Sequence, residues 1–596
     1  MSITRIILLY IFCGINFHAN AQGYLRTDGK KIINDKGEVI LRGVGLGGWM
    51  LQEPYMLNVS DVAGSQQEIR QKITTLIGEN NTEKFYEAWL NNHCTKRDID
   101  SLAAWGFNSV RLPMHYNLYT LPVENEKTAG KNTWLTKGFT MTDSLLSWCK
   151  ANRIYLILDM HAAPGGQGND NAISDRDASK KSLWQSEANQ QKLIALWSKL
   201  AERYANEQWI GAYDIINEPN WGFENESDRN GCAEKLNIPL RKLMVDISKA
   251  IRKKDKKHII IIEGNCWGNN YQGVFPLWDK NTVLSFHKYW NYNTTESIQQ
   301  VLQNRSTYNV PVWLGETGEN SNTWFTSVIR LMEENKIGWN MWPLKKSGKN
   351  NLLQVPVNQG FKDIIAYWNG QTQKPSEESA FKSLMEFARN TNIANNIVRR
   401  EVIDAMTRQV TNDECLSFQP NKINVTPTLF ASDYDLGRSG MAYHDADSAE
   451  YWVSAGTRTK WNEGGHYRND GVDIETCTDS LSNGFQVGWI VDGEWLQYTL
   501  YTDKASTYDL HIRSASQSAT GELQLFVNGS ATETKLTLPA TGSFNTWQTS
   551  TMKSVKLNAG MNRVRVMAVK GGFNLNYFQF IPTDNTAMIN LKESIN

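Results

Sequence analysis

Eight short apolar runs alternate with segments of helical periodicity between residues 23 and about 410. The runs are rich in Val, Ile, Leu and aromatic residues, which is typical of parallel strands buried on both faces. The segments between them repeat apolar residues three and four positions apart, as an amphipathic helix requires. This alternation predicts an α/β fold of the (β/α)8 TIM-barrel type. The eight runs are 41–49, 109–113, 155–161, 211–219, 258–264, 282–289, 311–318 and 338–344.

Further helical patterns lie outside this alternation. Two of them, near 66–76 and 82–92, fall within the first strand-to-helix connection, and we expect them to decorate it. The segment 376–409 has the same periodicity after the last apolar run, which predicts terminal helices packed on the barrel. The barrel domain is therefore expected to span 23–410.

The composition changes after the predicted barrel. Gly, Ser and Thr become more frequent, and short runs of alternating polarity replace the helical patterns. Turn signals such as Asn528-Gly529 and Asn558-Ala559-Gly560 separate these runs, as in antiparallel sheets. The pattern predicts an all-β sandwich (jelly-roll) domain at 426–582, after a linker at 411–425 and before a polar tail at 583–596.

The chain begins with the features of a secretory signal. Arg5 precedes an apolar run at 6–15, and Ala19-Asn20-Ala21 is a small-x-small cleavage site. The run is too short to span a bilayer as a helix. We therefore expect residues 1–21 to be a cleaved signal peptide. The mature protein would then be secreted or periplasmic, with no membrane partner.

The charge balance and the cysteines narrow the classes of partner and site. The 62 basic and 62 acidic residues give a formal net charge of zero, which offers no electrostatic reason to bind nucleic acid. The cysteines beyond the signal segment are scattered without a CxxC pair, so neither a disulfide framework nor a zinc site is indicated. An isolated bridge can still form after export. The 22 Trp, 22 Tyr and 20 Phe suit either large cores or stacking on sugar rings.

Two glutamates end the fourth and the seventh apolar runs. Glu218 follows Ile215-Ile216-Asn217, and Glu316 follows Trp313-Leu314-Gly315. The carboxyl ends of all strands meet at one mouth of a (β/α)8 barrel, so the two side chains can converge there. Hydrolysis of a glycosidic bond requires two such groups, one to protonate the leaving oxygen and one to attack the sugar.

Asn217-Glu218-Pro219, followed at this distance by Gly315-Glu316-Thr317, resembles the retaining glycoside hydrolases of family 5. The resemblance implies that Glu218 is the general acid/base and Glu316 the nucleophile of an O-glycosyl hydrolase. It also implies that Asn217 contacts the sugar 2-hydroxyl.

The opening of the barrel carries a finer resemblance. The stretch 41–49 and the Gln52-Glu53-Pro54 that follows it are similar to the exo-β-1,3-glucanase branch of the family. That branch usually has Asn where this chain has Val44-Gly45. The likeness favours a β-1,3-glucan substrate without fixing the subfamily.

Side chains at other strand ends fit the same site. Arg111 is expected beside the proposed nucleophile, where a guanidinium favours the ionised carboxylate. Phe286-His287-Lys288-Tyr289 resembles the family's strand-six motif, which implies that Tyr289 hydrogen-bonds the nucleophile. The same resemblance implies that His161 is the strand-three histidine and that Trp342 floors the −1 sugar site. Any one of them is as easily a packing group, but several in strand order around one barrel indicate a site.

Asp159 and Glu263 also end apolar runs and form an alternative catalytic pair. Neither has the sequence context of Glu218 or Glu316, and Asp159 is better suited to orient a neighbour. The sequence contains no metal-ligand spacing, and the glycine-rich 163–166 lacks the lysine of a phosphate loop. We therefore expect catalysis without a metal or other cofactor.

Residues 426–582 are similar to carbohydrate-binding modules of family 6. The resemblance implies a loop-borne cleft in which Tyr467 and Trp547 sandwich a sugar and Asn574 fixes its hydroxyls. Trp489 and Trp495 alternate within strand patterns, so we expect them in the core. The segments that carry the resemblance, in the family's order, are 442–445, 467–475, 487–489, 492–498 and 573–578.

Members of that family commonly hold a structural calcium through an acidic first strand. Here Phe430 and Ser432 stand at the carboxylate positions, which disfavours calcium in the sandwich, although backbone carbonyls could supply ligands.

Together these features predict an exported, retaining β-glycan hydrolase with a sugar-binding module and a polysaccharide as its partner. A β-glucan, in particular β-1,3-glucan, is the favoured substrate. The alternative within enzymes is another β-glycan, such as β-1,4-glucan or β-mannan. The alternative from another class is a glycan-binding protein that has kept the barrel as a scaffold, and the presence of both glutamates argues against it.

Overall fold

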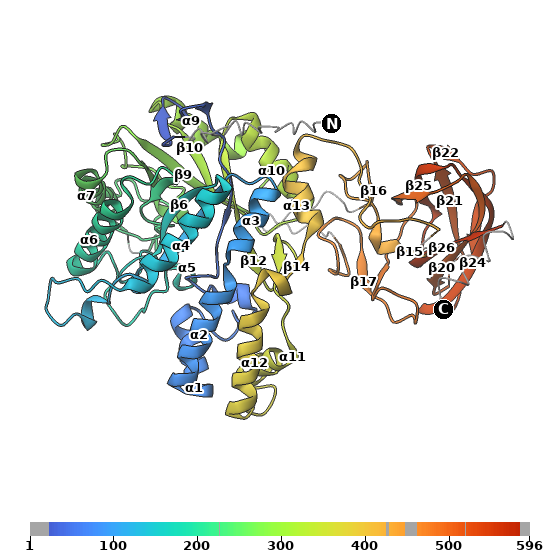
Figure 1. Ribbon diagram of the computed structural model, residues 1–596, viewed down its shortest axis with the longest axis horizontal. Helices are drawn as coiled ribbons and strands as arrows, with labels where there is room; N and C mark the ends of the chain where they lie inside the picture. The colour runs from blue at the N-terminus through green and yellow to red at the C-terminus, as the bar shows by residue number, and fades with distance from the viewer. Residues whose placement is uncertain (1–22, 226, 425–427, 447–461, 519, 584–596) are drawn as a thin grey trace, which may run out of the picture.

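The computed structural model describes the chain except for residues 1–22, 226, 425–427, 447–461, 519 and 584–596. The predicted signal peptide and nearly all of the predicted tail lie outside the described residues. Figure 1 shows two bodies side by side, a larger α/β body formed by the first part of the chain and a smaller β body formed by the last part.

A closed barrel of eight parallel strands forms the centre of the larger body, as the sequence predicts. The strands follow the order β10-β11-β4-β5-β6-β7-β8-β9 around the barrel. Their side chains are buried on both faces because helices surround the barrel, which explains the nearly continuous apolar runs. The strands are β4 (Arg42–Gly45), β5 (Ser109–His115), β6 (Tyr155–Ala162), β7 (Ile210–Asp214), β8 (Ile259–Glu263), β9 (Thr282–Lys288), β10 (Val312–Gly318) and β11 (Gly338–Trp342).

Amphipathic helices cover the outside of the barrel. Their buried faces repeat at helical spacing, as in Leu240, Leu243, Met244, Ile247 and Ile251 on one helix. Several tryptophans fill the space between sheet and helices, so part of the high aromatic content serves the core. The main covering helices are α3 (Lys96–Ala104), α4 (Thr136–Asn152), α6 (Glu187–Tyr204), α7 (Ile238–Lys254), α9 (Gln299–Thr307) and α10 (Asn322–Glu334).

A small antiparallel sheet, which the sequence pattern did not reveal, precedes the barrel. It consists of β1 (Arg26–Asp28), β2 (Lys31–Asn34) and β3 (Gly37–Glu38). Asn34 donates to the Tyr155 hydroxyl at the first residue of β6, so the sheet lies at the N-terminal end of the barrel. A site is therefore expected at the opposite end of the barrel, where the carboxyl ends of the strands lie.

A helical subdomain with its own apolar core projects from the barrel at the bottom of Figure 1. The two predicted patterns in the first connection are indeed helices, α1 (Gln66–Ile77) and α2 (Glu79–His93). They pack with α12 (Glu377–Asn390), whereas α13 (Arg400–Met406) packs on α10. The expectation that the terminal helices all cover the barrel is therefore correct only for α13. α11 (Gln359–Trp368) completes the subdomain.

The smaller body is an antiparallel sandwich of two six-stranded sheets, as predicted. Asn528 and Gly529 both have positive φ in a tight hairpin turn, as the sequence signal indicated. One sheet contains β15 (Thr428–Phe430), β17 (Ile474–Thr476), β18 (Phe485–Val487), β20 (Ser506–Ser516), β24 (Ser543–Leu557) and β26 (Asn574–Pro582). The other contains β16 (Tyr443–His444), β19 (Trp495–Thr502), β21 (Gly521–Val527), β22 (Ser530–Ala531), β23 (Leu536–Leu538) and β25 (Gly560–Lys570).

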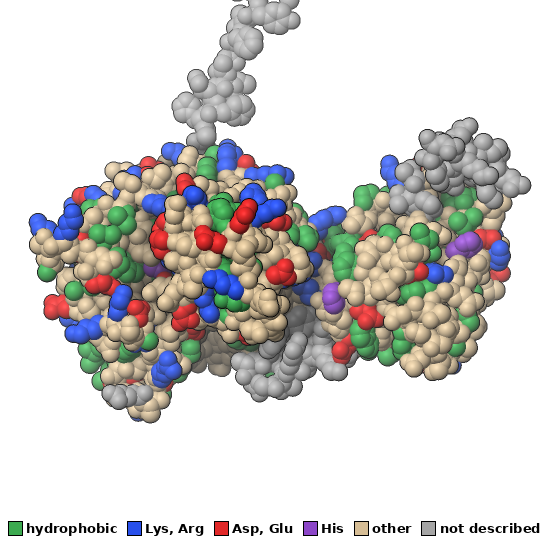
Figure 2. Space-filling view, turned by 90° about the horizontal axis from the view of Figure 1, so that it is seen from below, with side chains coloured by type: hydrophobic (Ala, Val, Ile, Leu, Met, Phe, Trp, Pro, Cys, Tyr) green, Lys and Arg blue, Asp and Glu red, His purple; other side chains and the backbone are tan. Residues whose placement is uncertain are grey.

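Charged side chains are mixed in sign over the larger body. In Figure 2 blue and red side chains alternate on its visible face, while the sandwich carries fewer of either. None of the described helices combines the length and apolarity that crossing a membrane requires.

Candidate active site

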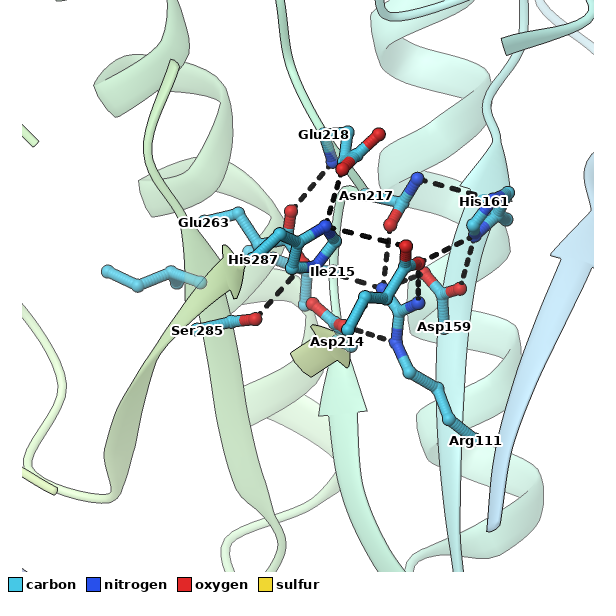
Figure 3. A network of polar contacts seen from close by, with 12 residues as sticks. Arg111, Asp159, His161, Asp214, Ile215, Asn217, Glu218, Glu263, Ser285 and His287 are labelled. Atoms are coloured by element: carbon cyan, nitrogen blue, oxygen red, sulfur yellow. Dashed lines mark hydrogen bonds and ion pairs between the residues drawn. The ribbon is translucent and has the colours of Figure 1, made fainter. Parts of the chain in front are cut away.

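Charged and polar side chains converge at the carboxyl ends of the barrel strands (Figure 3). Glu218 and Glu316 are brought together there, although 98 positions separate them in the sequence. One carboxylate oxygen of Glu218, one of Glu316 and one ring nitrogen of His287 all lie within 4.8 Å of one another. The other members of the group are Arg111 of β5, Asp159 and His161 of β6, Asp214 of β7 and Glu263 of β8.

Glu218 lies in the loop after β7 and not in the strand, because β7 ends at Asp214. Its backbone φ of 44° is in the left-handed region, which aims the side chain into the mouth of the barrel. The carboxylate of Glu263 accepts a hydrogen bond from the Glu218 backbone N–H at 2.7 Å and so holds this conformation. Burial raises the pKa of the Glu218 carboxyl to about 7, although His287 acts in the opposite direction.

Glu316 near the end of β10 has the opposite electrostatic setting. Arg111 Nη1 donates to its Oε1 at 2.5 Å, and the Tyr289 hydroxyl donates to its Oε2 at 2.7 Å. Burial alone would raise the pKa of Glu316, but the positive charges of His287 and Arg111 bring it below its ordinary value. The pKa values of the two carboxyl groups are therefore pushed apart, and between them Glu218 is protonated while Glu316 is ionised.

His287 at the end of β9 connects the carboxylates. Its Nδ1 lies 2.5 Å from Glu218 Oε1, and its Nε2 lies 3.1 Å from Glu263 Oε1. Burial would lower the pKa of the His287 ring, but Glu263, Glu316 and Glu218 raise it well above its usual range. The three donors Glu218, His287 and Glu316 are close enough to surround a cation. Both ring nitrogens are nonetheless engaged by carboxylates, so the imidazolium leaves no lone pair for a metal.

Arg111 balances the negative charge below the two glutamates. It is fully buried and forms ion pairs with Asp214 at 2.8 Å, Asp159 at 3.2 Å and Glu263 at 3.4 Å, besides Glu316. Its Nη2 also donates to Asn217 Oδ1 at 2.7 Å, which orients the amide of the residue before Glu218. The predicted place of this guanidinium beside Glu316 agrees with the geometry.

His161 and Trp342 form one wall of the site. Their rings stack with centroids 4.9 Å apart, and Asp159 Oδ2 lies 2.7 Å from His161 Nδ1, so Asp159 orients this neighbour. The Trp342 indole N–H donates to the Tyr55 hydroxyl at 3.1 Å. Trp342 is almost completely buried, so little of its ring is accessible.

A further acidic group beside the site, Glu53, was missed as a site residue from the sequence. Glu53 is buried, and its Oε1 lies 3.7 Å from His161 Nε2. Burial raises its pKa to about 7. The Gln52-Glu53-Pro54 motif was the available signal, but it follows β4 through an irregular segment, and nothing in its spacing shows that it turns back over the mouth. Glu263 was recognised only as a rival to the catalytic pair and not as the group that holds Glu218.

One disulfide joins two loops at the rim of the site, Cys232 to Cys266. Beside it the Trp267 N–H donates to the Pro219 carbonyl at 3.1 Å, directly after Glu218. Asn265 Oδ1 accepts from the Trp221 N–H at 3.0 Å. The isolated bridge that the sequence left open therefore ties the segment after Glu218 to the segment after β8.

The predicted residues of the sandwich cleft do not all lie together. Asn574 donates to the Phe544 carbonyl at 3.3 Å, on the strand that also carries the partly exposed Trp547. Tyr467 instead stacks on Phe485 with centroids 4.6 Å apart, and its carbonyl accepts from Arg399 of the larger body. Its position faces the joint between the two bodies.

Trp489 corrects a second expectation about the sandwich. It is 49% exposed, with a positive φ of 50°, and is not in the core. The preceding Gly488 packs so closely that an added Cβ would lie 3.1 Å from Asn574 Oδ1. The alternation that predicted burial fails because β18 ends at Val487, before Trp489.

Comparisons with known proteins agree with this division of the chain. Residues 67–348 match the sequence model of the family described as Cellulase (glycosyl hydrolase family 5). Residues 464–582 match that of the family described as Carbohydrate binding module (family 6).

Relatives whose names give different specificities resemble the chain at a similar level. It is 26% identical to a "Beta-xylosidase" of Phanerodontia chrysosporium, covering 58% of this chain and 76% of that protein. It is 26% identical to "Endoglucanase C" of Acetivibrio thermocellus, covering 47% of this chain and 93% of that protein. It is also 26% identical to the "Probable glucan 1,3-beta-glucosidase A" of Aspergillus niger, covering 34% of this chain and 46% of that protein.

The solved structures that the chain matches include a rutinosidase from Aspergillus niger, with 18% identity and a TM-score of 0.43. That match covers 52% of this chain and 91% of the other. The cellulase Cel5C_n matches with 17% identity and a TM-score of 0.37, over 61% and 92%.

Proposed function

We propose that this protein hydrolyses a β-glycan with retention of the anomeric configuration. Its barrel belongs to glycosyl hydrolase family 5, and its sandwich contains a family 6 carbohydrate-binding module. The observation that carries this proposal is the separation of the Glu218 and Glu316 oxygens, below 4.8 Å. Retaining enzymes keep their carboxyl groups about 5–5.5 Å apart, whereas inverting enzymes leave ~6.5–9.5 Å for a water molecule. The short separation favours a direct attack by one carboxylate.

The pKa values of the two carboxyl groups support one assignment of roles. Glu218, protonated because burial raises its pKa, gives its proton to the glycosidic oxygen as that bond breaks. Glu316, ionised beside Arg111 and His287, attacks the anomeric carbon and forms a glycosyl ester. The sugar chain on the other side of the broken bond leaves as an alcohol.

The second step reverses the role of Glu218. Once Glu316 is esterified it carries no charge, so its contribution to the raised pKa of Glu218 is lost. Glu218 is then a carboxylate that accepts a proton from water, and the resulting hydroxide cleaves the ester with net retention at the anomeric carbon. Tyr289 and Arg111 orient Glu316 through both of its oxygens during the cycle.

The favoured substrate is a β-glucan, in particular β-1,3-glucan, because the stretch 41–49 and the Gln52-Glu53-Pro54 that follows it resemble the exo-β-1,3-glucanase branch. A β-1,4-glucan or β-mannan substrate is the alternative. A panel of soluble polysaccharides with product-size analysis decides between them, and proton NMR of the first product reports the anomer. Release of the opposite anomer would contradict the retaining assignment, and cleavage of no glycan would favour the binding-only alternative.

Replacement of the nucleophile provides the matched test of the site. Glu316→Ala should abolish turnover with an unchanged circular-dichroism spectrum, and added azide should restore part of the activity with an inverted azide product. Activity of the variant at the wild-type rate would contradict the role of Glu316.

The sandwich is proposed to bind the same polysaccharide. Trp489 is half exposed and follows Gly488, which packs on Asn574, and Trp547 is partly exposed on the strand whose Phe544 carbonyl accepts from Asn574. Aromatic rings suit the apolar faces of sugars. Export is proposed from the N-terminal signal pattern, and the Cys232–Cys266 disulfide supports it because such bonds persist in oxidising compartments.

A further inference from the structure

The sandwich contacts the barrel through a short loop, residues 467–470, which we call the docking loop. The loop packs on the segment between β10 and α10. The Asn322 backbone N–H donates to the Asn469 carbonyl at 3.0 Å, and Asn322 Nδ2 donates to Asp470 Oδ1 at 2.7 Å. In the other direction the Asn469 amide donates to the Asn320 carbonyl at 2.9 Å. Asn320, Asn322, Asn469 and Asp470 are all buried, so these hydrogen bonds are shielded from water.

Buried charges hold the docking loop in place from within the sandwich. Arg468 lies between the rings of Phe418 and Tyr434, 4.2 Å and 4.1 Å from their centroids, and forms an ion pair with Asp470 at 2.8 Å. On the barrel side Arg399 donates to the Tyr467 carbonyl and pairs with Glu401 at 2.6 Å. Each of these ion pairs lies within one body, so they keep the two sides of the joint rigid, while the buried hydrogen bonds of Asn322, Asn469 and Arg399 cross it.

The segment that receives the docking loop begins at the proposed nucleophile. Glu316 is followed by Thr317 and Gly318 at the end of β10, and then by Glu319, whose φ of 55° turns the chain toward α10. Asn320, fully buried, donates its side-chain amide to the Tyr289 carbonyl at 3.3 Å. The Tyr289 hydroxyl in turn donates to Glu316.

A second set of contacts ties the same helix to the loop after Tyr289. The Trp324 indole in the first turn of α10 donates to the Asn291 carbonyl at 2.9 Å, and Asn293 donates to the Trp324 carbonyl at 3.1 Å. The Lys288 ammonium lies 5.1 Å from the centre of the Trp324 ring. A shift of the start of α10 would therefore move both sides of Tyr289.

We propose that Asn469 of the sandwich is a positioning residue for hydrolysis in the barrel, acting through Asn320 on Tyr289 and hence on Glu316. This inference rests on the proposed function, because it takes Glu316 as the nucleophile. The Asn469 amide fixes the Asn320 backbone, and the Asn320 amide fixes the Tyr289 backbone. The hydroxyl of Tyr289 then meets Glu316 in the orientation that keeps it ionised. In this view the sandwich is required for full catalytic competence, even on substrates too short to reach its sugar site.

The test compares full-length Asn469→Ala with the wild type on a short soluble aryl glycoside. The kcat should fall roughly tenfold, with KM changed less than twofold, since small misplacements of a catalytic group cost rate more than affinity. If Tyr289 is held less firmly, its hydrogen bond to Glu316 weakens, and the pKa of Glu316 rises toward its ordinary value. The acid limb of the kcat/KM profile should therefore move to higher pH, which a merely structural role would not produce.

Three further variants sharpen the test. Asn469→Asp keeps the size of the side chain but loses the amide N–H, so it should behave as Asn469→Ala does. Asn320→Ala should give a similar loss, and the double variant Asn320→Ala/Asn469→Ala should lose little more than either single variant, because both act on one path. Asn558→Ala, at an exposed asparagine in the turn between β24 and β25, should keep wild-type kinetics.

A wild-type kcat and acid limb in both Asn469 variants would overturn the inference. A lowered melting temperature with unchanged kcat would also overturn it, since the contact would then be mechanical only. Failure of the proposed function would look different, because the wild type itself would then cleave no glycoside.

Discussion

The backbone N–H of Glu218 donates a hydrogen bond to the side chain of Glu263, with 2.7 Å between nitrogen and oxygen. A left-handed φ at a residue other than glycine is strained by about 1–2 kcal/mol, and this bond compensates for that strain. Glu263 is held ionised: burial would raise its pKa, but His287 and Arg111 bring it to about 2.

Substitution of Glu263 should therefore impair Glu218 as the general acid, although Glu218 itself is unchanged. Glu263→Ala leaves the Glu218 amide without its acceptor and His287 without one of its carboxylates. We expect kcat to fall by about 10²-fold, because the Glu218 carboxyl moves from its productive position. Steady-state kinetics measures this loss, and the circular-dichroism spectrum serves as the control for folding. A kcat within twofold of the wild type would mean that Glu218 holds its place unaided.

The two carboxyl groups predict a bell-shaped pH dependence of kcat/KM. Glu316 must be ionised, so activity is lost as the pH falls through its pKa, which lies below the 4.5 of an ordinary glutamate. Glu218 must be protonated, so activity is also lost as the pH rises through its pKa of about 7. Initial rates from pH 3 to 9 at low substrate concentration provide the measurement. A basic limb that persists in Glu218→Gln would belong to another group.

The acid role of Glu218 predicts a dependence on the leaving group. Glu218→Gln cannot protonate the glycosidic oxygen, so hydrolysis of natural glycans should fall by roughly 10²–10⁴-fold, the usual contribution of a general acid. Aryl glycosides with acidic phenols need little protonation, and formation of the glycosyl ester from them should be much less affected. Pre-steady-state release of the phenol measures that step. Equal losses on both kinds of substrate would argue against this role.

The sugar site of the sandwich predicts a separation of binding from turnover. Stacking on each ring contributes about 1 kcal/mol, so Trp489→Ala/Trp547→Ala should weaken binding to insoluble glycan roughly tenfold or more. Hydrolysis of short soluble oligosaccharides should continue at the wild-type rate. Pull-down on the insoluble polysaccharide measures retention, and Tyr501→Ala, at an exposed aromatic of β19, is the matched control. Full retention of the double variant would place the sugar site elsewhere.

The disulfide at the rim predicts a reductant-sensitive stability. Cys232 and Cys266 are 34 positions apart, and closing a loop of that length restricts the unfolded chain by about 3–4 kcal/mol. Cys232→Ser/Cys266→Ser should lower the melting temperature, as should dithiothreitol added to the wild type. Calorimetry with and without reductant checks this. A double variant that still responds to dithiothreitol would show that another thiol is involved.

The barrel was predictable from the sequence because its strands are buried on both faces. Each of the eight apolar runs corresponds to a strand of the closed barrel, and the strand ends identify where polar side chains meet. Arg111, His287 and Glu316 come from strands whose neighbours are set by the barrel order. Their convergence therefore follows from topology once the strands are known.

Contacts made by irregular segments were not predictable in the same way. Glu53 and the docking loop lie outside regular strands, so no periodicity relates them to the groups they meet. Trp489 looked like a strand residue because its neighbours alternate, but the strand ends two residues earlier. Tyr467 matched a motif of the sandwich family, while its actual contacts depend on a partner domain that no local pattern describes.

The buried joint between barrel and sandwich also has a geometric consequence. A module on a flexible tether samples many distances, and its benefit is an averaged local concentration of substrate. Here the docking loop fixes the offset between the proposed sugar site of the sandwich and the pair Glu218 and Glu316. A polysaccharide held by the module would present to the barrel a sugar unit at a set number of residues from the point of attachment. The protein would then cleave its substrate at a defined distance from the sugar unit that the module holds.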